Sequence, residues 1–364
     1  MKKLSALILA CVLMLSLLAG CAGTTVVIGN CDGNCKNCPQ VSAPQETDPQ
    51  ETQPAEGAVM TGLSVSTKIS ESKSATAEAA GEAKYDVTLA AVLVDENGVI
   101  VDCVIDSVPA TVQFDASGNI ASALDMEVPT KNEMGENYGM VAWGGAIAEW
   151  DAQVAAVAKY AVGKTVEELK NGDIDMTTGK AKDGTDLASS ATIYLASYVY
   201  AIEAAVNNAQ NLGAQAGDEL VLSTLNTVKS STNATAEQDG VAQLDCDIVA
   251  LSKKNNVITS CFIDSVQAKI AFNASGEITT DLSAAVKTKN ELGEAYGMVA
   301  WGGAIAEWNA QAAAFADYIT GKTAEEVAGI AITETTKPAD GTDLAASVTI
   351  AIGGFQALIA KAML

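Results

Sequence analysis

"KYDVTLAAVLVDENGVIVDCVIDSV", residues 84–108, places apolar and β-branched residues on both sides of the pair Asn97 and Gly98. Asn-Gly is the strongest short signal for a tight hairpin turn, because both residues tolerate positive φ. The stretch ATVQFDASGNI at 110–120 then supplies a further strand and a further turn. Together these segments predict an antiparallel meander of strands.

The same pattern returns once, as LDCDIVALSKKNNVITSCFIDSV at 244–266 and AKIAFNASGEI at 268–278. Between the two sets, TKNEMGENYGMVAWGGAIAEWDAQ at 130–153 matches TKNELGEAYGMVAWGGAIAEWNAQ at 288–311. The chain is therefore a tandem duplication, and each unit has the size of an ordinary domain. We predict an α+β fold with two domains, 61–215 and 216–364, each an antiparallel sheet packed with helices.

The middle of each unit is predicted to be helical, because its apolar residues advance by four, three, four and three positions and so share one helix face. This spacing favours packing of the tryptophans against the sheet over a role in ring stacking. The two stripes are Trp143, Ile147, Trp150, Val154 and Val157, and Trp301, Ile305, Trp308, Ala312 and Phe315.

Two hydroxyl-rich strings, DGTDLASSATIY at 183–194 and DGTDLAASVTIA at 340–351, each precede a long apolar segment. A helix beginning near Ser189 would place the Thr192 hydroxyl in or beside its first turn. Unpaired backbone N–H groups and the helix dipole favour an anion there. The same strings fit ordinary helix caps equally well, since Asp, Ser and Thr are favoured N-cap residues. A phosphate site and a plain cap both remain open at this point.

The N-terminus predicts an exported lipoprotein. Lys2 and Lys3 are followed by an apolar run and by LAGC, the sequence that lipoprotein signal peptidase cuts before cysteine. We expect residues 1–20 to be a signal peptide, Cys21 to carry lipid, and the protein to face outward from the cell membrane. The run is short for a membrane span. Residues 21–60, rich in Pro, Gln, Glu and Thr, are expected to form a disordered tether.

Composition excludes several classes of site. The chain has no histidine and no arginine, which removes histidine-based triads, histidine metal sites and bidentate arginine clamps. Its formal net charge of -24 argues against a nucleic-acid partner. The tether contains three closely spaced cysteines, Cys31, Cys35 and Cys38. An iron–sulfur cluster requires four ligands, so we expect a local disulfide with one thiol left over instead of a metal site.

The string DLASSAT at 186–192 resembles the flavinylation motif of the FMN-binding domain family, D-x-x-S/T-G-A-T, whose last threonine carries FMN through a phosphoester bond. With its lipobox, tether and two such domains, nearly all of the mature chain resembles the flavinylated extracellular electron-transfer lipoproteins of Gram-positive bacteria. The resemblance implies that Thr192 is the acceptor, Asp186 the motif acid and Ser189 the fourth-position hydroxyl. Ser190 stands where the motif has glycine.

In the second unit the resemblance implies Asp343 as the motif acid and Thr349 as the acceptor. Ala346, Ser347 and Val348 depart from the motif, because the fourth-position hydroxyl and the motif alanine are both absent. Attachment of FMN at Thr192 is therefore the better-supported expectation. Possible contacts to the flavin are the lysine, tyrosine and methionine of the matching central segments, namely Lys131, Tyr138 and Met140, and Lys289, Tyr296 and Met298.

The family resemblance also implies partners. A separate magnesium-dependent flavin transferase attaches the FMN, membrane quinol-oxidising machinery supplies electrons, and soluble flavin or ferric iron outside the cell accepts them. The expected activity is that of an electron carrier more than of an enzyme with its own substrate. Two other interpretations stay open: a bivalent surface-binding protein whose Ser/Thr strings are only caps, and a terminal extracellular reductase.

Overall fold

Two three-stranded antiparallel meanders form the centre of the fold, and they follow directly from the alternating strands of each repeat. The computed structural model describes residues 57–364. The signal peptide, Cys21, the tether as far as residue 56 and the three cysteines within it lie outside the described residues. The first sheet has the order β1-β2-β3 and the second the order β6-β7-β8.

The elements of the first repeat, in chain order, are β1 (Met60–Lys68), β2 (Gly81–Val94), β3 (Ile100–Phe114), α1 (Lys131–Met134), η1 (Gly135–Tyr138), α2 (Met140–Gly144), α3 (Trp150–Ala161), α4 (Val166–Asn171), β4 (Ile174–Asp175), β5 (Lys180–Ala181), α5 (Asp186–Ser190) and α6 (Ala196–Asn207). Those of the second repeat are β6 (Glu219–Thr227), β7 (Gly240–Lys254), β8 (Val257–Phe272), α7 (Lys289–Leu292), η2 (Gly293–Tyr296), α8 (Met298–Gly302), α9 (Trp308–Ile319), α10 (Ala324–Ala328), η3 (Leu344–Ala346) and α11 (Gly353–Ala362).

The predicted α+β class and the antiparallel sheets packed with helices are confirmed. The hairpin predicted at Asn97 and Gly98 joins β2 to β3, with Val94 opposite Ile100 and a positive φ of 78° at Gly98. In the second repeat, Asn255 and Asn256 both have positive φ and join β7 to β8. The turn chemistry of each hairpin therefore sets the register of its sheet.

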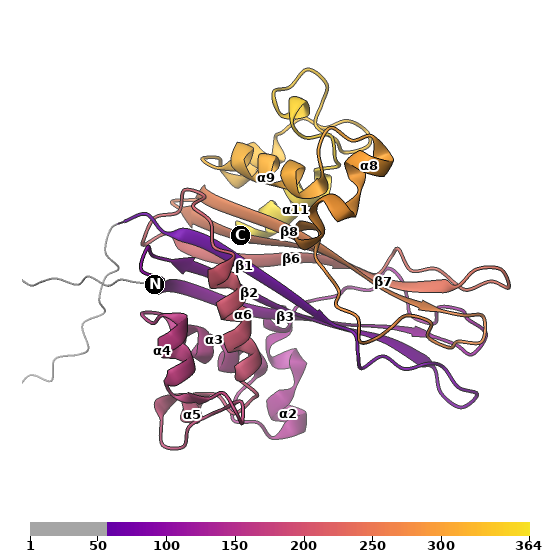
Figure 1. The fold of residues 1–364 in the computed structure, drawn as a ribbon, viewed down its shortest axis with the longest axis horizontal. Helices are drawn as coiled ribbons and strands as arrows, with labels where there is room; N and C mark the ends of the chain where they lie inside the picture. Colours follow the sequence, from indigo (N-terminus) through magenta and orange to yellow (C-terminus); the bar gives the residue numbers. More distant parts are fainter. Residues whose placement is uncertain (1–56) are drawn as a thin grey trace, which may run out of the picture. The chain divides into compact units, whose positions relative to one another are not determined.

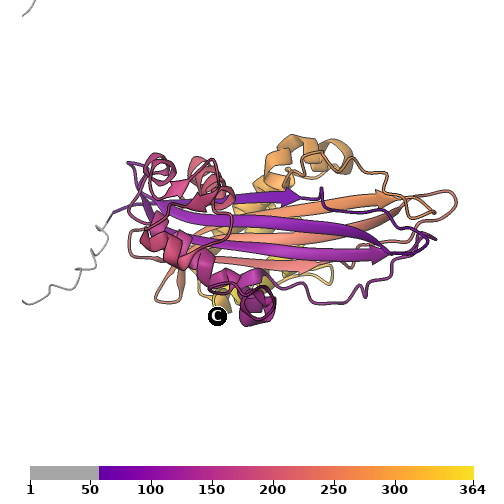
Figure 2. The ribbon, with the colours of Figure 1, turned by 90° about the horizontal axis from the view of Figure 1, so that it is seen from below.

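Period-two alternation divides the apolar side chains between the two faces of each sheet. On β2, Leu89, Ala91 and Leu93 point into a core shared with the second sheet, whereas Ala90 and Val92 point toward the helices of their own repeat. The order of layers is thus helices, sheet, sheet, helices. Figure 1 shows α3 to α6 on one side of the strands and α8 and α9 on the other, and Figure 2 shows the strands of both sheets following nearly the same direction.

The contacts between the two sheets are reciprocal. The Ala75 N–H donates to the Gly276 carbonyl at 2.7 Å, and the equivalent Ala234 N–H donates to the Gly118 carbonyl at 2.8 Å. Phe114 and Phe272, the last residues of β3 and β8, stack with ring centroids 4.1 Å apart. The duplication has therefore produced an internal version of the self-complementary interface that is typical of a two-fold dimer.

Two predictions are corrected, and one pair of strands was not predicted. Val59 is buried and β1 begins at Met60, so the tether ends before residue 57 and not at residue 60. β1 and its counterpart β6, edge strands of nine residues each, were not predicted. The separate strand expected at 110–120 is the end of one long strand, since β3 continues through Pro109, which an edge strand tolerates.

Candidate functional site

The threonine that the motif singles out lies between two helices and not in the first turn of one. The apolar helix that was expected to begin near Ser189 is α6, and it begins only at Ala196. Ser189 itself lies in the short helix α5, which ends at Ser190. Thr192 follows Ala191, whose backbone is extended at φ -142° and ψ 119°. The prediction of an anion site at a helix N-terminus is therefore wrong, and a different contact holds this segment.

That contact is Gln153, a fully buried residue of α3. Its Oε1 accepts hydrogen bonds from the backbone N–H of Thr192 at 2.8 Å, from the Thr192 hydroxyl at 3.3 Å and from the Ile193 N–H at 3.3 Å. Its Nε2 donates to the Ala148 carbonyl at 2.8 Å. A buried amide must pair its polar atoms, and here the pairing joins two loops to one helix.

The second repeat reproduces this arrangement. Gln311, also fully buried, accepts from the Thr349 N–H at 2.7 Å and from the Thr349 hydroxyl at 3.2 Å, and it donates to the Ala306 carbonyl at 2.7 Å. Thr192 is exposed and Thr349 is partly exposed. Each threonine therefore contacts solvent although its backbone is fixed from inside.

The other motif residues lie on the short helices that precede each threonine. Asp186, Ser189 and Ser190 are exposed in α5, and the Ser190 hydroxyl donates to the Asp186 carbonyl at 3.1 Å. In the second repeat Asp343 and Ser347 flank η3 and are exposed as well, and the Ser347 hydroxyl donates to the Leu344 carbonyl. The strings do not cap the long apolar helices, since α6 follows Leu195 and α11 follows Ile352 without a side-chain cap, so the plainer interpretation of them as caps of those helices is wrong as well.

The predicted lysine and tyrosine of each repeat are brought together with a tryptophan. The Lys131 ammonium lies 5.3 Å from the Tyr138 ring centroid and 5.1 Å from that of Trp150, and its side chain is only 11% exposed. Asp86 lies 3.7 Å from the ammonium. A cation beside two aromatic rings is attracted electrostatically, and this contact places Lys131 near the N-terminal end of α3.

In the second repeat, Lys289 lies 5.4 Å from the Tyr296 centroid and 4.9 Å from that of Trp308. Burial lowers the pKa of Lys289, while the carboxylates of Asp247 and Asp245 act in the opposite direction. Met140 and Met298 are partly buried against the helical core of their repeats. The structure thus places these predicted residues around the tryptophan that precedes the glutamine by three positions, which is one helical turn away.

Buried aspartates fix the loop that carries each lysine. Asp264 on β8 accepts from the N–H of Ser265 at 2.7 Å and from that of Asn290 at 3.2 Å, and Asp106 on β3 does the same with Ser107 and Asn132. Burial raises the pKa of both carboxyls, and that of Asp264 reaches about 6, although the hydrogen bonds they accept act in the opposite direction.

This burial predicts a pH dependence of stability. The folded state binds the Asp264 proton more tightly than the unfolded chain, where the ordinary value is 3.8. The resulting stabilisation is fully present below about pH 4 and is lost as the pH rises through about 6, a change of at most about 3 kcal/mol. Urea denaturation between pH 4 and 7 should give a flatter profile for Asp264→Asn than for the wild type. Identical slopes would contradict the assignment.

The single tryptophan stripe predicted for each repeat is wrong. The helix breaks after Gly144, Gly145 has a positive φ of 63°, and α3 begins only at Trp150. Trp150 is buried, but Trp143 is 90% exposed, and in the second repeat Trp308 is buried while Trp301 is 90% exposed. The glycine pair overrides the helical periodicity, so only the second tryptophan of each repeat packs against the sheet.

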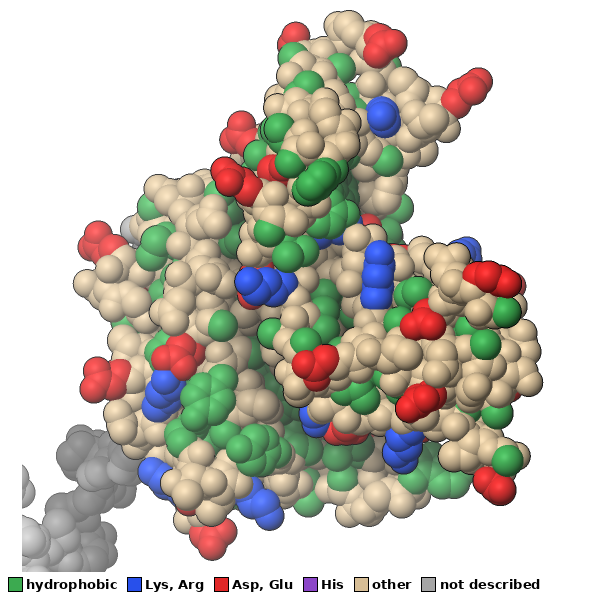
Figure 3. Space-filling view, turned by 45° about the vertical axis from the view of Figure 1, so that its right-hand side comes forward, with side chains coloured by type: hydrophobic (Ala, Val, Ile, Leu, Met, Phe, Trp, Pro, Cys, Tyr) green, Lys and Arg blue, Asp and Glu red, His purple; other side chains and the backbone are tan. Residues whose placement is uncertain are grey.

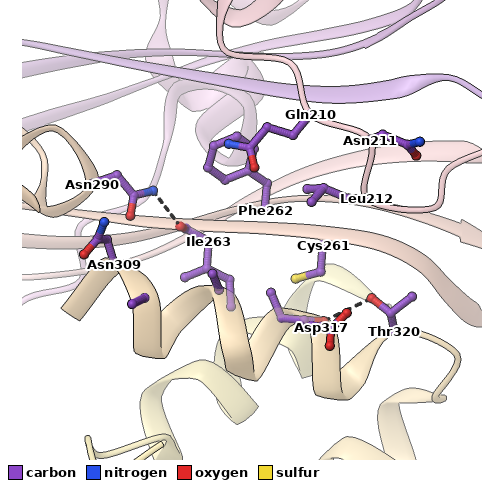
Figure 4. A pocket seen from close by; sticks show the side chains of 13 residues that line it. Gln210, Asn211, Leu212, Cys261, Phe262, Ile263, Asn290, Asn309, Asp317 and Thr320 are labelled. Atoms are coloured by element: carbon purple, nitrogen blue, oxygen red, sulfur yellow. Dashed lines mark hydrogen bonds between the residues drawn. The ribbon is translucent and has the colours of Figure 1, made fainter. Parts of the chain in front are cut away.

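Two equivalent cavities flank the same helices on another side. One of about 470 Å³ lies between α9, β8 and residues 210–212, and one of about 390 Å³ lies between α3 and β3. Figure 4 shows Asn290 and Asn309 at one end of the larger cavity and Thr320 at the other. Gln311 lies about 200° around the helix axis from Asn309. The cavities are therefore separate from the threonine sites.

The three cysteines within residues 57–364 are buried free thiols, and burial raises the pKa of each. Cys103 and Cys261 line the two cavities. Figure 3 shows acidic side chains spread over one face, with lysines placed singly among them. Within the described part of the chain, no helix is long and apolar enough to span a membrane, and no cluster of three acidic or cysteine side chains is arranged to hold a metal ion.

Gln153 and Gln311 were missed as site residues. The signal was available, since EWDAQ and EWNAQ preserve the glutamine in both repeats at the same distance from the tryptophan. A glutamine three residues after an apolar anchor carries no chemistry by itself, and its role depends on a loop 39 residues further on. Comparison of the chain with protein-family models, with curated proteins and with solved structures gave no match.

Proposed function

We propose that this protein is an extracellular electron carrier with FMN joined by a phosphoester bond to Thr192 and, in the second repeat, to Thr349. One observation carries the proposal. In both repeats the threonine of the DLA string is at least partly exposed while its backbone is held by a buried glutamine. A plain helix cap would not need this buried anchor, because caps bond to their own helix.

The residues present fit a covalently attached flavin. Esterification of Thr192 removes one hydrogen bond, from its hydroxyl to Gln153, and leaves the N–H bonds of Thr192 and Ile193 to the same oxygen. The attachment point therefore stays fixed when the hydroxyl is modified. Since those N–H groups are already paired, the phosphate would rely on solvent and not on backbone donors. The second repeat has the same donor set around Thr349.

FMN, when bound, supplies the redox chemistry by accepting and releasing electrons. The chain's own residues have simpler tasks. Gln153 and Gln311 orient the attachment segments, and Lys131 and Lys289, each beside two aromatic rings, lie at the same end of α3 and α9. A covalent link prevents loss of the cofactor to the medium, which matters for an exported protein.

The cellular setting belongs to the same proposal. Lipid on Cys21 would hold the protein on the outer face of the cell membrane, and residues 21–56 would act as the tether. A magnesium-dependent flavin transferase would load the two threonines, quinol-linked machinery would donate electrons, and soluble flavin or ferric iron would accept them. The net charge of -24 slows the approach of anionic acceptors, an effect that salt would screen.

The proposal is tested by colour and redox response. Protein produced together with a flavin transferase and magnesium should remain yellow after denaturation and desalting, should bleach with dithionite, and should recover its colour with ferric iron. Protein produced without the transferase is the control and should be colourless. A colourless product under loading conditions would instead favour the surface-binding interpretation. Turnover of a specific substrate at the reduced protein would favour the reductase.

A further inference from the structure

Each repeat presents one tryptophan almost wholly to solvent. Trp143 and Trp301 are both 90% exposed, in a chain whose other two tryptophans are buried. The residues around Trp143 are apolar and exposed too, Val141 at 46% and Ile147 at 55%. The second repeat keeps the same pattern with Val299 and Ile305. A large apolar side chain left in water, twice and at equivalent positions, indicates a binding surface.

Trp143 lies in the short helix α2, which with the residues up to Glu149 forms a loop-like segment held in place by hydrogen bonds. The Glu149 carboxylate accepts the N–H groups of Met140 at 2.8 Å and Val141 at 3.0 Å. The indole lies directly on Gly139, where an added Cβ would be 2.3 Å from Trp143 Cδ1. Gly139 also has a positive φ of 80°. The ring is thus presented on a preformed support, which lowers the entropy cost of binding a ligand.

The exposed tryptophan belongs to the same hydrogen-bonded unit as the threonine. The loop runs from Met140 to Glu149, and its Ala148 carbonyl accepts from Gln153 Nε2. The other end of the Gln153 amide holds Thr192. Ala306, Gln311 and Thr349 repeat this chain of contacts beside Trp301. One buried glutamine therefore links the apolar loop to the attachment segment in both repeats.

We infer that Trp143 stacks on the isoalloxazine ring of the flavin joined to Thr192, and that Trp301 does the same for the flavin joined to Thr349. This inference rests on the function proposed above. The isoalloxazine ring is flat and aromatic, and an offset stack on an indole buries the apolar faces of both rings. Because the flavin is tethered beside the loop, its effective concentration there is high and a single ring contact can be populated.

The chemistry of the loop favours this occupant over others. The surrounding side chains, Val141 and Ile147, offer apolar contact, and the Glu149 carboxylate is already occupied by two N–H groups. A partner protein is the competing occupant of the same surface. The two differ in one respect: the tethered ring contacts Trp143 in the isolated protein, whereas a partner does so only when added.

The experiment uses the full chain, loaded by the transferase, with the threonine of one repeat removed. In a Thr349→Ala background only the first repeat carries FMN, so Trp143→Ala is the test and Trp301→Ala is its matched control. Indole stacking quenches flavin fluorescence. We expect Trp143→Ala to raise the fluorescence per attached flavin several-fold, Trp143→Phe to raise it less, and Trp301→Ala to leave it unchanged. In a Thr192→Ala background the two tryptophans should exchange roles.

Intact mass measured on the same samples distinguishes failure of the stacking inference from failure of flavin attachment itself. An adduct that is present, with equal fluorescence in Trp143→Ala and its parent, would overturn the stacking inference and leave the proposed function standing. Absence of any adduct in the parent would overturn both. Because Trp143 is 90% exposed, the variants should keep the parent's Tm. If Trp143→Ala nevertheless unfolds at a lower temperature, Trp143→Phe, which retains an aromatic ring, provides the comparison of fluorescence.

Discussion

Gln153→Leu is expected to lower the free energy of unfolding by about 2–5 kcal/mol and to abolish flavin attachment at Thr192. The side chain is fully buried and pairs with the N–H groups of Thr192 and Ile193 and with the Ala148 carbonyl. Leucine has similar volume but leaves these groups without partners, and each unsatisfied buried group costs about 1–3 kcal/mol. The loop and the threonine would then lose their common anchor.

Urea denaturation measures the first effect and intact mass of the loaded protein measures the second. Gln113→Leu, the same change at an exposed position of β3, is the matched control and should alter stability by less than about 0.5 kcal/mol. The adduct at Thr349 should survive in Gln153→Leu and disappear in Gln311→Leu. If Gln153→Leu were as stable as Gln113→Leu, the glutamine would not be the anchor described here.

Phe114→Ala is expected to destabilise both repeats together, by about 3–5 kcal/mol. Phe114 is fully buried and stacks on Phe272 with an interplanar angle of 6°, within the core that the two sheets share. Because this core contains residues of both repeats, the loss cannot be confined to one of them. Urea denaturation should show a single transition at a lower midpoint.

The matched control is Phe315→Ala, an equally buried phenylalanine that packs only among the helices and sheet of the second repeat. Phe114→Ala and Phe272→Ala should be non-additive by about 0.5–1.5 kcal/mol, the usual coupling of an aromatic pair, whereas Phe114→Ala and Phe315→Ala should add. Two separate transitions in Phe114→Ala would mean that the repeats unfold independently.

The parts of the fold that were predictable are those set by neighbouring residues. The hairpin at Asn97 and Gly98 follows from the φ that these residues allow, and the antiparallel sheets follow from alternation along β2 and β3. The reciprocal pairing of the two sheets was not predictable. A duplicated sequence predicts two equivalent apolar sheet faces but does not predict that these two faces pack against each other, as they do at Phe114 and Phe272.

At the candidate site the motif located the threonines but not their surroundings. Helical periodicity predicted one continuous helix through Trp143 and Trp150, and the Gly144 and Gly145 pair broke it because Gly145 takes a positive φ of 63°. The expected helix start at Thr192 failed for a different reason. The backbone there bonds to Gln153, which is distant in sequence, and local preference cannot reveal such a contact.

Intact mass of the protein loaded by a flavin transferase shows whether Thr192 and Thr349 carry the flavins. It is measured for the wild type, Thr192→Ala, Thr349→Ala and the double variant. The wild type should carry two FMN adducts, each single variant one, and the double variant none. Thr192→Ser and Thr349→Ser retain a hydroxyl and serve as controls for the substitution itself. An unmodified wild type, or a double variant that still carries flavin, would contradict the assignment of these two threonines.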